Sequence, residues 1–453
     1  MRILPLASNS ESRQAEPAVV VGDAAGATTI AALPKHIEME PNGASLACAP
    51  PPLGFDSDKL LALQQAIPTE LQLLRLRLRF GLPKRVHLDQ KFRVVVDLVD
   101  EMGQPSPIGL PPSDSLSLSV DAQLILKVEE ESSSARKQQR HTKWTFMASL
   151  HQPTDAVAIP SDVSLIIQIQ QSPPLPGDSS VAGAFRRPFQ RFCRGSTWLN
   201  DQVLVLPLQV ALQVVAAEAP FETSTVCQRV FCASLPRTSA GGEKPRLLVI
   251  EEHYGDAMGA HVWDASILLS FVLLEAGIAS SESLNQHQTV VELGSGCGLF
   301  ASVLTTFCSS QAEFTAIFTE KPECTARLQH NLQSMDAMVL PLEWGEPLPA
   351  ILSSADVTVV FAADVLYNWA AHEALLTTLD GFTASHMQLL LAHKRRGHSS
   401  AAKMDALAAG AYDPATQCGV KTDTNECRWS HWHVEKLAAL GRIDLFRVSR
   451  RAQ

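Results

Sequence analysis

The chain has 453 residues, of which 46% are hydrophobic and 19% are charged, and its formal net charge is −10 at pH 7. This length allows two or three domains, each with a core of its own. Non-specific binding to DNA or RNA needs a basic surface, so the acidic balance argues against a nucleic-acid-binding protein.

The nine cysteines are scattered, and the closest pair, Cys227 and Cys232, has no second pair that would complete a zinc site. We therefore expect small buried thiols in a reducing compartment, and no metal. The longest apolar stretch, residues 265–274, is shorter than the roughly 20 residues of a membrane-spanning helix. The amino terminus has no apolar signal-peptide region. These features predict a protein of the cytoplasm or the nucleus without a membrane partner.

Residues 1–57 are rich in Ala, Gly, Pro and Ser and keep no helical or strand period, which predicts a disordered tail. A short helix is expected next, in DKLLALQQAI (58–67). Residues 58–220 then contain short strand patterns, such as FRVVVDLV (92–99), between turns of Pro, Gly and Ser. This part is predicted to be an all-β accessory domain, an immunoglobulin-like or similar β-sandwich.

Two basic segments interrupt these strands, at 135–143 and 185–195. We interpret both as solvated loops, with a nucleic-acid-binding patch as the alternative.

From residue 221 to residue 453 the pattern becomes strand and helix in alternation. The segments VCQRVFCASL (226–235) and RLLVIEEHY (246–254) are expected to pair as a hairpin around a hinge. The alternation that follows predicts a mostly parallel sheet with helices on both faces, whose ligands bind beyond the carboxyl ends of the strands. Near the end, WHVEKLAALG (432–441) is predicted to be a helix and IDLFRVSR (443–450) the last strand.

Three alternating glycines, Gly294, Gly296 and Gly298, follow a buried-strand pattern and precede a helix pattern. Glycine accepts positive φ and lets a ligand approach the backbone, and the helix that follows turns its N–H groups toward that ligand. A dinucleotide fingerprint would need glycine where Leu299 stands, and a phosphate-binding P-loop would need a lysine. The spacing fits an S-adenosylmethionine loop better, with Glu292 two residues ahead; a tight turn without a ligand is the alternative.

Glu320 supports the interpretation as a cofactor loop. It ends the next strand pattern, FTAIFTE, 22 positions after Gly298. A carboxylate there can accept hydrogen bonds from both hydroxyls of a ribose. The alternative is an exposed charge at the end of a strand.

Several motifs together resemble the seven-β-strand protein-lysine methyltransferases: GAHVWDASILLSFVLLEAG, VVELGSGCGL, TEK, LEWG and FAADVLYN, in this order. That family includes enzymes that act on chaperones, an AAA ATPase, calmodulin and translation elongation factors. The resemblance covers about residues 223–450. It implies an α/β, Rossmann-like, seven-stranded methyltransferase domain in residues 221–453 and S-adenosyl-L-methionine as cofactor. The implied reaction is methyl transfer to a protein side chain, lysine Nε, in a substrate such as a chaperone, an ATPase or a translation factor.

The resemblance also implies roles for single residues. Trp263 would lie beside the cofactor, Trp344 near its adenine, and Glu320 at its ribose, although the family usually has Asp at that last position. The whole implied cofactor-binding set is Trp263, Glu292, Gly294, Ser295, Gly296, Gly298, Glu320, Trp344 and Ala363. The two tryptophans have the alternative of being core aromatics.

The implied catalytic residues are Asp364 and Tyr367. Asp364 would orient the target amine, and Tyr367 would shape the mouth of the site. Methyl transfer to an amine needs positioning and a neutral nucleophile rather than covalent help. Asp364 has the alternative of being a helix N-cap.

Some features depart from the family. Cys297 replaces a more usual Thr, and HKRRGHSS (393–400) is more basic than the family pattern, so we expect a solvated loop there. The segment ADVLY is unlike the Asn/Asp-Pro-Pro-Tyr/Phe motif of many enzymes that methylate nucleic-acid bases. The alternatives left open are a non-catalytic scaffold with a degenerate methyltransferase fold, and a histidine, arginine or non-protein acceptor. We expect a monomer whose accessory domain is a substrate-docking arm.

Overall fold

The computed structural model describes a little under two thirds of the chain, in thirteen stretches. These are residues 54–108, 115–121, 124–130, 142–154, 160–170, 181–215, 222–234, 245–253, 258–279, 288–309, 314–382, 387–397 and 432–450. Of the tail predicted for residues 1–57, residues 1–53 therefore lie outside the described residues. Its last residues are ordered, because β1 (Gly54–Phe55) and the start of α1 (Ser57–Ala66) fall within it.

Helix α1 confirms the helix expected over residues 58–67, one residue earlier at each end. Asp56 caps it, since its carboxylate accepts the backbone N–H groups of Asp58 and Lys59, each at 3.1 Å.

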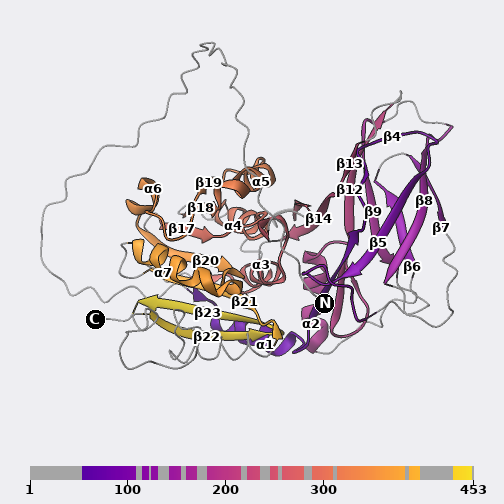
Figure 1. Cartoon of the computed structure of the whole chain (residues 1–453). Helices are drawn as coiled ribbons and strands as arrows, with labels where there is room; N and C mark the ends of the chain where they lie inside the picture. Colours follow the sequence, from indigo (N-terminus) through magenta and orange to yellow (C-terminus); the bar gives the residue numbers. More distant parts are fainter. Residues whose placement is uncertain are drawn as a thin grey trace, which may run out of the picture. The chain divides into compact units, whose positions relative to one another are not determined.

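Two six-stranded sheets make up the all-β part of the chain (Figure 1). The first has the order β10-β11-β2-β5-β8-β7, with β2 (Gln72–Leu78), β5 (Phe92–Val99), β7 (Ile125–Glu130), β8 (Lys143–His151), β10 (Thr197–Trp198) and β11 (Val203–Leu206). The second has the order β15-β14-β12-β9-β6, with β4 (Arg85–His87) also paired to β12; its strands are β6 (Ser115–Val120), β9 (Asp162–Gln170), β12 (Leu208–Val215), β14 (Val226–Ala233) and β15 (Arg246–His253). The short strands β3 (Leu82–Pro83) and β13 (Thr223–Ser224) pair with each other.

The two sheets share one core. Alternate residues of a strand point to the same face, and here Leu76, Val96, Leu165 and Leu208 from both sheets are fully buried in a single hydrophobic cluster. The part is therefore built of two layers of strands; its immunoglobulin-like topology stays a prediction.

The hairpin predicted on either side of residue 235 is confirmed. Strands β14 and β15 pair antiparallel from Val226 with His253 to Ala233 with Arg246. Strand β14 also pairs with β12, so the second sheet includes residues on both sides of 220. The domain boundary predicted there divides this sheet, because the sequence shows a composition change but not which strands pair.

The basic segment 185–195, predicted to be a loop, largely belongs to helix α2 (Val181–Phe192). Phe185, Phe189 and Phe192 are spaced by four and three residues, so they lie on one face of the helix and pack against Phe271, with ring centroids 5.0 to 6.0 Å apart. The arginines of the segment obscured this apolar face. Apart from Thr142 and Lys143, the other basic segment lies outside the described residues.

A seven-stranded sheet forms the α/β part, in the order β19-β18-β17-β20-β21-β23-β22. Five strands run parallel: β17 (Gln288–Leu293), β18 (Phe314–Glu320), β19 (Met338–Pro341), β20 (Val357–Ala363) and β21 (Gln388–Lys394). Strand β23 (Ile443–Arg450) is antiparallel to both neighbours, β21 and β22 (Trp432–Leu440). The alternation of strands and helices thus forms the predicted mostly parallel sheet.

Strand β22 corrects the helix predicted for residues 432–441. Its Ala, Glu, Lys and Leu residues favour a helix, but pairing with β23 outweighs that preference. The chain turns at Gly441, where φ is +63°. A register shift between Lys436 and Ala438 accounts for the broken alternation of apolar residues.

Helices cover both faces of the sheet. On one face, α3 (Asp264–Ala276), α4 (Leu299–Ser309) and α5 (Pro322–Leu332) share a hydrophobic cluster with α1 and α2. On the other face lie α6 (Ala350–Ser353) and α7 (His372–Gly381). The short 3₁₀ helices are η1 (Met258–Ala260), η2 (Val365–Tyr367) and η3 (Trp369–Ala371), and β16 (Ile278–Ala279) pairs with β1.

Helix α3 joins the two parts of the chain. It is apolar on all sides and nearly every residue is buried, as expected for a helix in the middle of a core. Its Phe271 contacts the phenylalanines of α2, while Leu268 and its neighbours belong to the same cluster as Val359 and Leu390 of the sheet. The all-β part is therefore packed into the core of the α/β part.

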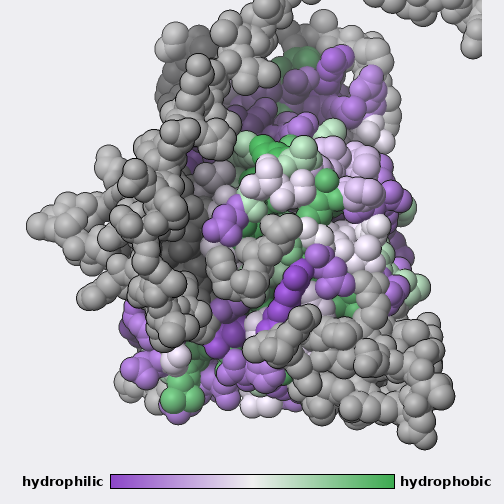
Figure 2. Space-filling view, turned by 90° about the vertical axis from the view of Figure 1, so that its left-hand side faces the viewer, coloured by the Kyte–Doolittle hydropathy of each residue, from purple (hydrophilic) through white to green (hydrophobic). Residues whose placement is uncertain are grey.

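The surface is mixed in character. Figure 2 shows one face on which apolar residues form small patches bordered by hydrophilic ones. Among the described residues, large apolar side chains such as Leu61, Phe80 and Leu247 are about half exposed. The helices that the structure describes are all too short or too polar to cross a membrane.

Candidate active site

A cavity of about 430 Å³ opens beyond the carboxyl ends of β17, β18 and β20. This is the edge of a parallel sheet at which ligands are expected to bind. Eight of the eleven predicted site residues line it: Trp263, Gly294, Gly296, Glu320, Trp344, Ala363, Asp364 and Tyr367. The other three, Glu292, Ser295 and Gly298, do not reach the cavity.

The glycines of the loop after β17 all have positive φ, a region that other residues rarely adopt. A Cβ atom on Gly294 would lie 3.3 Å from Val365 Cγ1 and 3.4 Å from Trp344 Cζ2. This glycine therefore keeps the space beside the Trp344 ring open. A Cβ atom on Gly298 would lie only 2.7 Å from Leu328 Cδ1, so that glycine lets the loop pack closely on α5.

Glu320 lies beside this loop at the end of β18. Its Oε2 accepts the backbone N–H of Gly296 at 2.7 Å, and its Oε1 accepts that of Lys321 at 3.0 Å. Burial raises the pKa of its carboxyl above the ordinary range, although these two hydrogen bonds oppose the shift. A carboxylate oxygen has two lone pairs, so each oxygen can still accept a hydroxyl group of a ligand.

Glu292 and Ser295 support the loop from behind. The backbone N–H of Ser295 donates to the Thr319 carbonyl at 2.9 Å, which ties the loop to the end of β18. Glu292 is buried, and burial raises the pKa of its carboxyl to about 8. Glu292 belongs to strand β17 and Ser295 to the loop that follows, and the sequence could not show that neither residue lines the cavity. Cys297, also buried, has its thiol pKa raised by burial, so it stays protonated.

Two tryptophans flank the cavity. The Trp263 indole donates from Nε1 to the Met258 carbonyl at 3.0 Å, which fixes its ring. Trp344 lies beside Gly294 and also lines the cavity. The cavity thus offers aromatic surface, a carboxylate and a glycine loop at the start of helix α4, which fit a nucleoside with an attached polar chain.

Asp364 follows β20 in a left-handed conformation, with φ at +61°, although it is not a glycine. Its backbone N–H donates to the Ala392 carbonyl at 2.7 Å. Its carboxylate is 4% exposed and accepts two parallel hydrogen bonds from Arg396, one of them 2.8 Å long. His393 Nδ1 lies 3.2 Å from Oδ1. Burial alone would raise the pKa of Asp364, but the hydrogen bonds from Arg396 and His393 hold it well below its ordinary range.

The basic segment after β21 corrects the prediction of a solvated loop. Arg396 binds Asp364, and its guanidinium carbon lies 5.5 Å from the centroid of the Trp263 ring. Lys394, 14% exposed, binds Asp264 and Glu101. One signal could have placed them here: the segment follows the strand next to β20, and parallel strands end at the same edge of a sheet.

Tyr367 lies at the rim, with 47% of its surface exposed. Partial burial raises the pKa of its phenol, so it stays a neutral hydroxyl. The rim thus has Tyr367 and Asn368 on η2 and the turn after it, and Trp263 before α3.

The sheet order, with the seventh strand inserted antiparallel next to β21, and the cavity at its carboxyl edge define a class I methyltransferase domain. Comparisons with known proteins give more detail on the kind of methyltransferase that this domain resembles. Residues 243–409 match the sequence model of a family described as lysine methyltransferase. This is the family that the motifs of the chain resemble.

Two curated relatives carry methyltransferase names. The mouse protein-lysine N-methyltransferase EEF2KMT is 26% identical over 199 residues, which are 40% of this chain and 55% of that protein. The human methyltransferase-like protein 21E pseudogene is 31% identical over 150 residues, which are 31% of this chain and 52% of that sequence. The chain thus spans about half the length of the curated relatives it matches.

Solved methyltransferases are also similar. The CurJ carbon methyltransferase shares 18% identity and a TM-score of 0.29 over 44% of this chain and 57% of that one. Human N-acetylserotonin methyltransferase in complex with SAM shares 14% identity and a TM-score of 0.25 over 36% of this chain and 48% of that one. Because these scores are low, the fold assignment depends on the strand order and the family match.

Proposed function

We propose that this protein transfers a methyl group from S-adenosyl-L-methionine to a lysine Nε of a protein substrate. The observation that carries the proposal is the cavity at the carboxyl ends of β17, β18 and β20, inside a segment that matches the lysine methyltransferase family. When bound, the cofactor supplies a methyl group on a sulfonium, which an amine can attack directly.

The residues of the cavity suit such a cofactor. Glu320 would accept hydrogen bonds from the ribose hydroxyls, and the backbone around Gly294 and Gly296 would hold the methionine end. Trp344 would pack against the adenine, since it borders the space that Gly294 keeps open. Glu292 and Gly298 would act through the shape of the loop, because neither lines the cavity.

The target lysine must reach the cavity as a neutral amine, and a free lysine has a pKa of about 10.4. The half-exposed Tyr367 and the Trp263 ring give the mouth an apolar wall, and removal of water lowers the pKa of an amine. Asp364 borders the cavity, but both its oxygens bind Arg396. We therefore assign the Asp364–Arg396 pair, rather than a free carboxylate, to the shaping of this mouth.

The substrate is proposed to be a protein, in keeping with the name of the mouse relative. The acidic net charge of −10 favours a basic segment of that protein around the target lysine. A chaperone, an ATPase or a translation factor stays the expected class.

The experiment has two measurements. Calorimetry with S-adenosylhomocysteine tests the cavity: wild type should bind, and Glu320→Ala should bind tenfold to a hundredfold more weakly, because about 1.5–3 kcal/mol of hydrogen bonding to a charged group is lost. Glu346→Gln, an exposed carboxylate that does not line the cavity, is the matched control and should bind as wild type does.

The second measurement follows tritium from labelled cofactor into protein of a cell lysate. Wild type should label discrete protein bands, and Glu320→Ala should not at the same cofactor concentration. Failure of wild type to bind S-adenosylhomocysteine would refute the proposal at the cavity. Binding without protein label would refute the protein acceptor and leave the cofactor site standing.

A further inference from the structure

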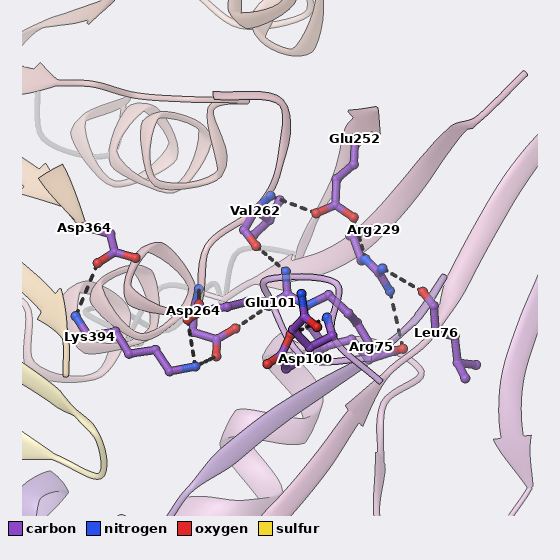
Figure 3. Close-up of polar contacts among 12 residues, drawn as sticks. Arg75, Leu76, Asp100, Glu101, Arg229, Glu252, Val262, Asp264, Asp364 and Lys394 are labelled. Carbon is purple, nitrogen blue, oxygen red and sulfur yellow. Dashed lines mark hydrogen bonds and ion pairs between the residues drawn. The ribbon is translucent and has the colours of Figure 1, made fainter. Parts of the chain in front are cut away.

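A buried cluster of charges lies where the all-β part meets the α/β part (Figure 3). Glu101, in the turn after β5, is 5% exposed. Its Oε1 lies 3.0 Å from Arg396 Nε and 3.0 Å from Lys394 Nζ. Its Oε2 accepts the backbone N–H of Asp264 at 3.2 Å, so a residue of the all-β part caps the start of helix α3.

The residues on both sides of Trp263 are held by the same part of the chain. Arg75, on β2, donates to the Val262 carbonyl at 2.6 Å and to the Asp264 carboxylate. The Val262 N–H donates at 2.8 Å to Glu252 of β15, and Arg229 of β14 donates to Glu252 at 2.7 Å. The position of Trp263 at the rim is thus set by contacts from both sheets.

Arg396 connects Glu101 to the cavity. Its guanidinium donates from Nε to Glu101 and from both terminal nitrogens to Asp364, and it lies over the Trp263 ring. Asp364 and Trp263 line the cavity, whereas Glu101 does not. A planar guanidinium with partners on both edges has a fixed orientation, because its donors form a rigid fork.

We propose that Glu101 is a positioning residue of the methyl-transfer site, which sets Arg396 between Asp364 and Trp263. The all-β part then completes the site, in addition to any role in docking a substrate. This inference rests on the proposed function for its effect on catalysis, but the position of Arg396 is testable without it.

The two parts are also joined by apolar contacts outside this charged cluster. The phenylalanines of α2 and Phe271 of α3 already form an apolar core between them. Buried ion pairs add little net stability compared with apolar packing of the same size. The removal of residues 1–220 would delete Arg75, Glu101 and the partners of Phe271 together, so a point substitution is the sharper test.

The substitution should change the pH dependence of the site. The groups facing Asp364 are Arg396, His393 and the backbone N–H of Lys394 from the β21 end, Glu101 from the all-β part and Tyr367 from η2. Burial favours the neutral form of Asp364, and Arg396 and His393 favour its ionised form. If Arg396 is no longer held beside Asp364, its lowering effect on the pKa is lost, and burial then raises the pKa of Asp364. Wild-type Asp364 stays ionised over the whole assay range, so its protonation in the variant would add a loss of rate at the low-pH end and displace the acid limb to higher pH.

The test compares Glu101→Gln with two controls. Phe189→Leu weakens the apolar core between the two parts without touching the charges, and Glu129→Gln removes an exposed ion pair with Lys91 from the same all-β part. Crystal structures report the position of Arg396. The rate of tritium transfer from labelled cofactor to lysate protein, measured between pH 5.5 and 9, reports the acid limb.

We expect Arg396 to leave Asp364 and the Trp263 ring in Glu101→Gln, with a tenfold or larger loss of rate and an acid limb displaced to higher pH. Phe189→Leu should lower the melting temperature without a shift of the limb, and Glu129→Gln should match wild type. Arg396 unmoved in Glu101→Gln, or a limb that moves equally in Phe189→Leu, would overturn the proposal.

A second variant tests the proposal if Glu101→Gln does not fold. Glu101→Asp keeps the charge and shortens the side chain by one methylene, so it should fold and shift the limb in the same direction by a smaller amount. An unshifted limb in that variant overturns the proposal. If wild type transfers no label at all, the proposed function fails, and the crystal structures alone still decide where Glu101 holds Arg396.

Discussion

Glu292 offers a test in which the size of the effect follows from the structure. The side chain is 1% exposed behind the glycine loop, and burial, helped by the nearby Glu320, raises its pKa from an ordinary 4.5 to about 8. At neutral pH the folded protein therefore holds a protonated carboxyl there. Replacement by Gln keeps the shape and removes the titration.

The sign and size follow from the two pKa values. Below pH 4.5 the group is neutral in the folded and unfolded states, so its contribution does not change with pH. As pH rises from 4.5 toward 8, the unfolded chain ionises and the folded one does not, so the folded state loses about 1.4 kcal/mol per unit. The loss is about 3 kcal/mol at pH 7 and approaches about 5 kcal/mol above pH 8. Glu292→Gln should escape this loss.

The assay is urea unfolding of both proteins at pH 5, 7 and 8.5, with Glu346→Gln as an exposed control. The difference in unfolding free energy between Glu292→Gln and wild type should grow by several kcal/mol between pH 5 and pH 8.5. A difference that stays constant over this range would show that Glu292 is not held protonated, and would refute the reasoning.

Three further predictions concern the loop and the core. Gly298→Ala should destabilise the fold by about 1–3 kcal/mol more than Gly296→Ala in urea unfolding, because only its Cβ would collide with Leu328; equal losses would contradict the packing role. Trp344→Ala should weaken S-adenosylhomocysteine binding about tenfold or more in calorimetry by removing an aromatic stacking surface worth about 1–3 kcal/mol; unchanged affinity would place the adenine elsewhere. Phe271→Ala should cost about 3–5 kcal/mol in urea unfolding because the side chain is buried between the two parts of the chain, and a loss below about 1 kcal/mol would show that they are not packed as described.

The sequence was informative where the signal is local. A glycine loop between a strand and a helix, and an acidic residue at the end of the next strand, are defined within about 30 residues, and the structure brings Gly294, Gly296 and Glu320 to one cavity. The motifs around Trp263, Trp344 and Asp364 added residues that spacing alone would not have selected, and the structure places them at the same cavity.

The partners of these residues could not be predicted in the same way. Glu101 and Arg396 are 295 positions apart, and neither lies in a pattern that points to the other. The direction of the Glu292 and Ser295 side chains depends on how the loop packs, which the sequence does not show. The Asp364 carboxylate was expected to face a target amine, because nothing local reveals that Arg396 already binds it.

The predictions about the fold that were wrong also depend on partners that are distant in the sequence. Residues 432–440 have the composition of a helix, but the neighbouring strand β23 makes them a strand. The arginines of α2 suggested a loop, because its phenylalanine stripe becomes meaningful only against Phe271. The boundary at residue 220 followed a change of composition, while the pairing of β12 with β14 crosses it.

The central claim is that the cavity serves methyl transfer to lysine, and amino-acid analysis tests it most directly. Protein labelled by the wild-type chain from tritiated S-adenosyl-L-methionine would be hydrolysed in acid and its amino acids separated beside methylated standards. The account predicts that the label elutes with methylated lysine, and that Glu320→Ala gives none. Label that elutes only with methylhistidine or methylarginine would contradict it, as would an absence of protein label from a wild-type chain that binds S-adenosylhomocysteine.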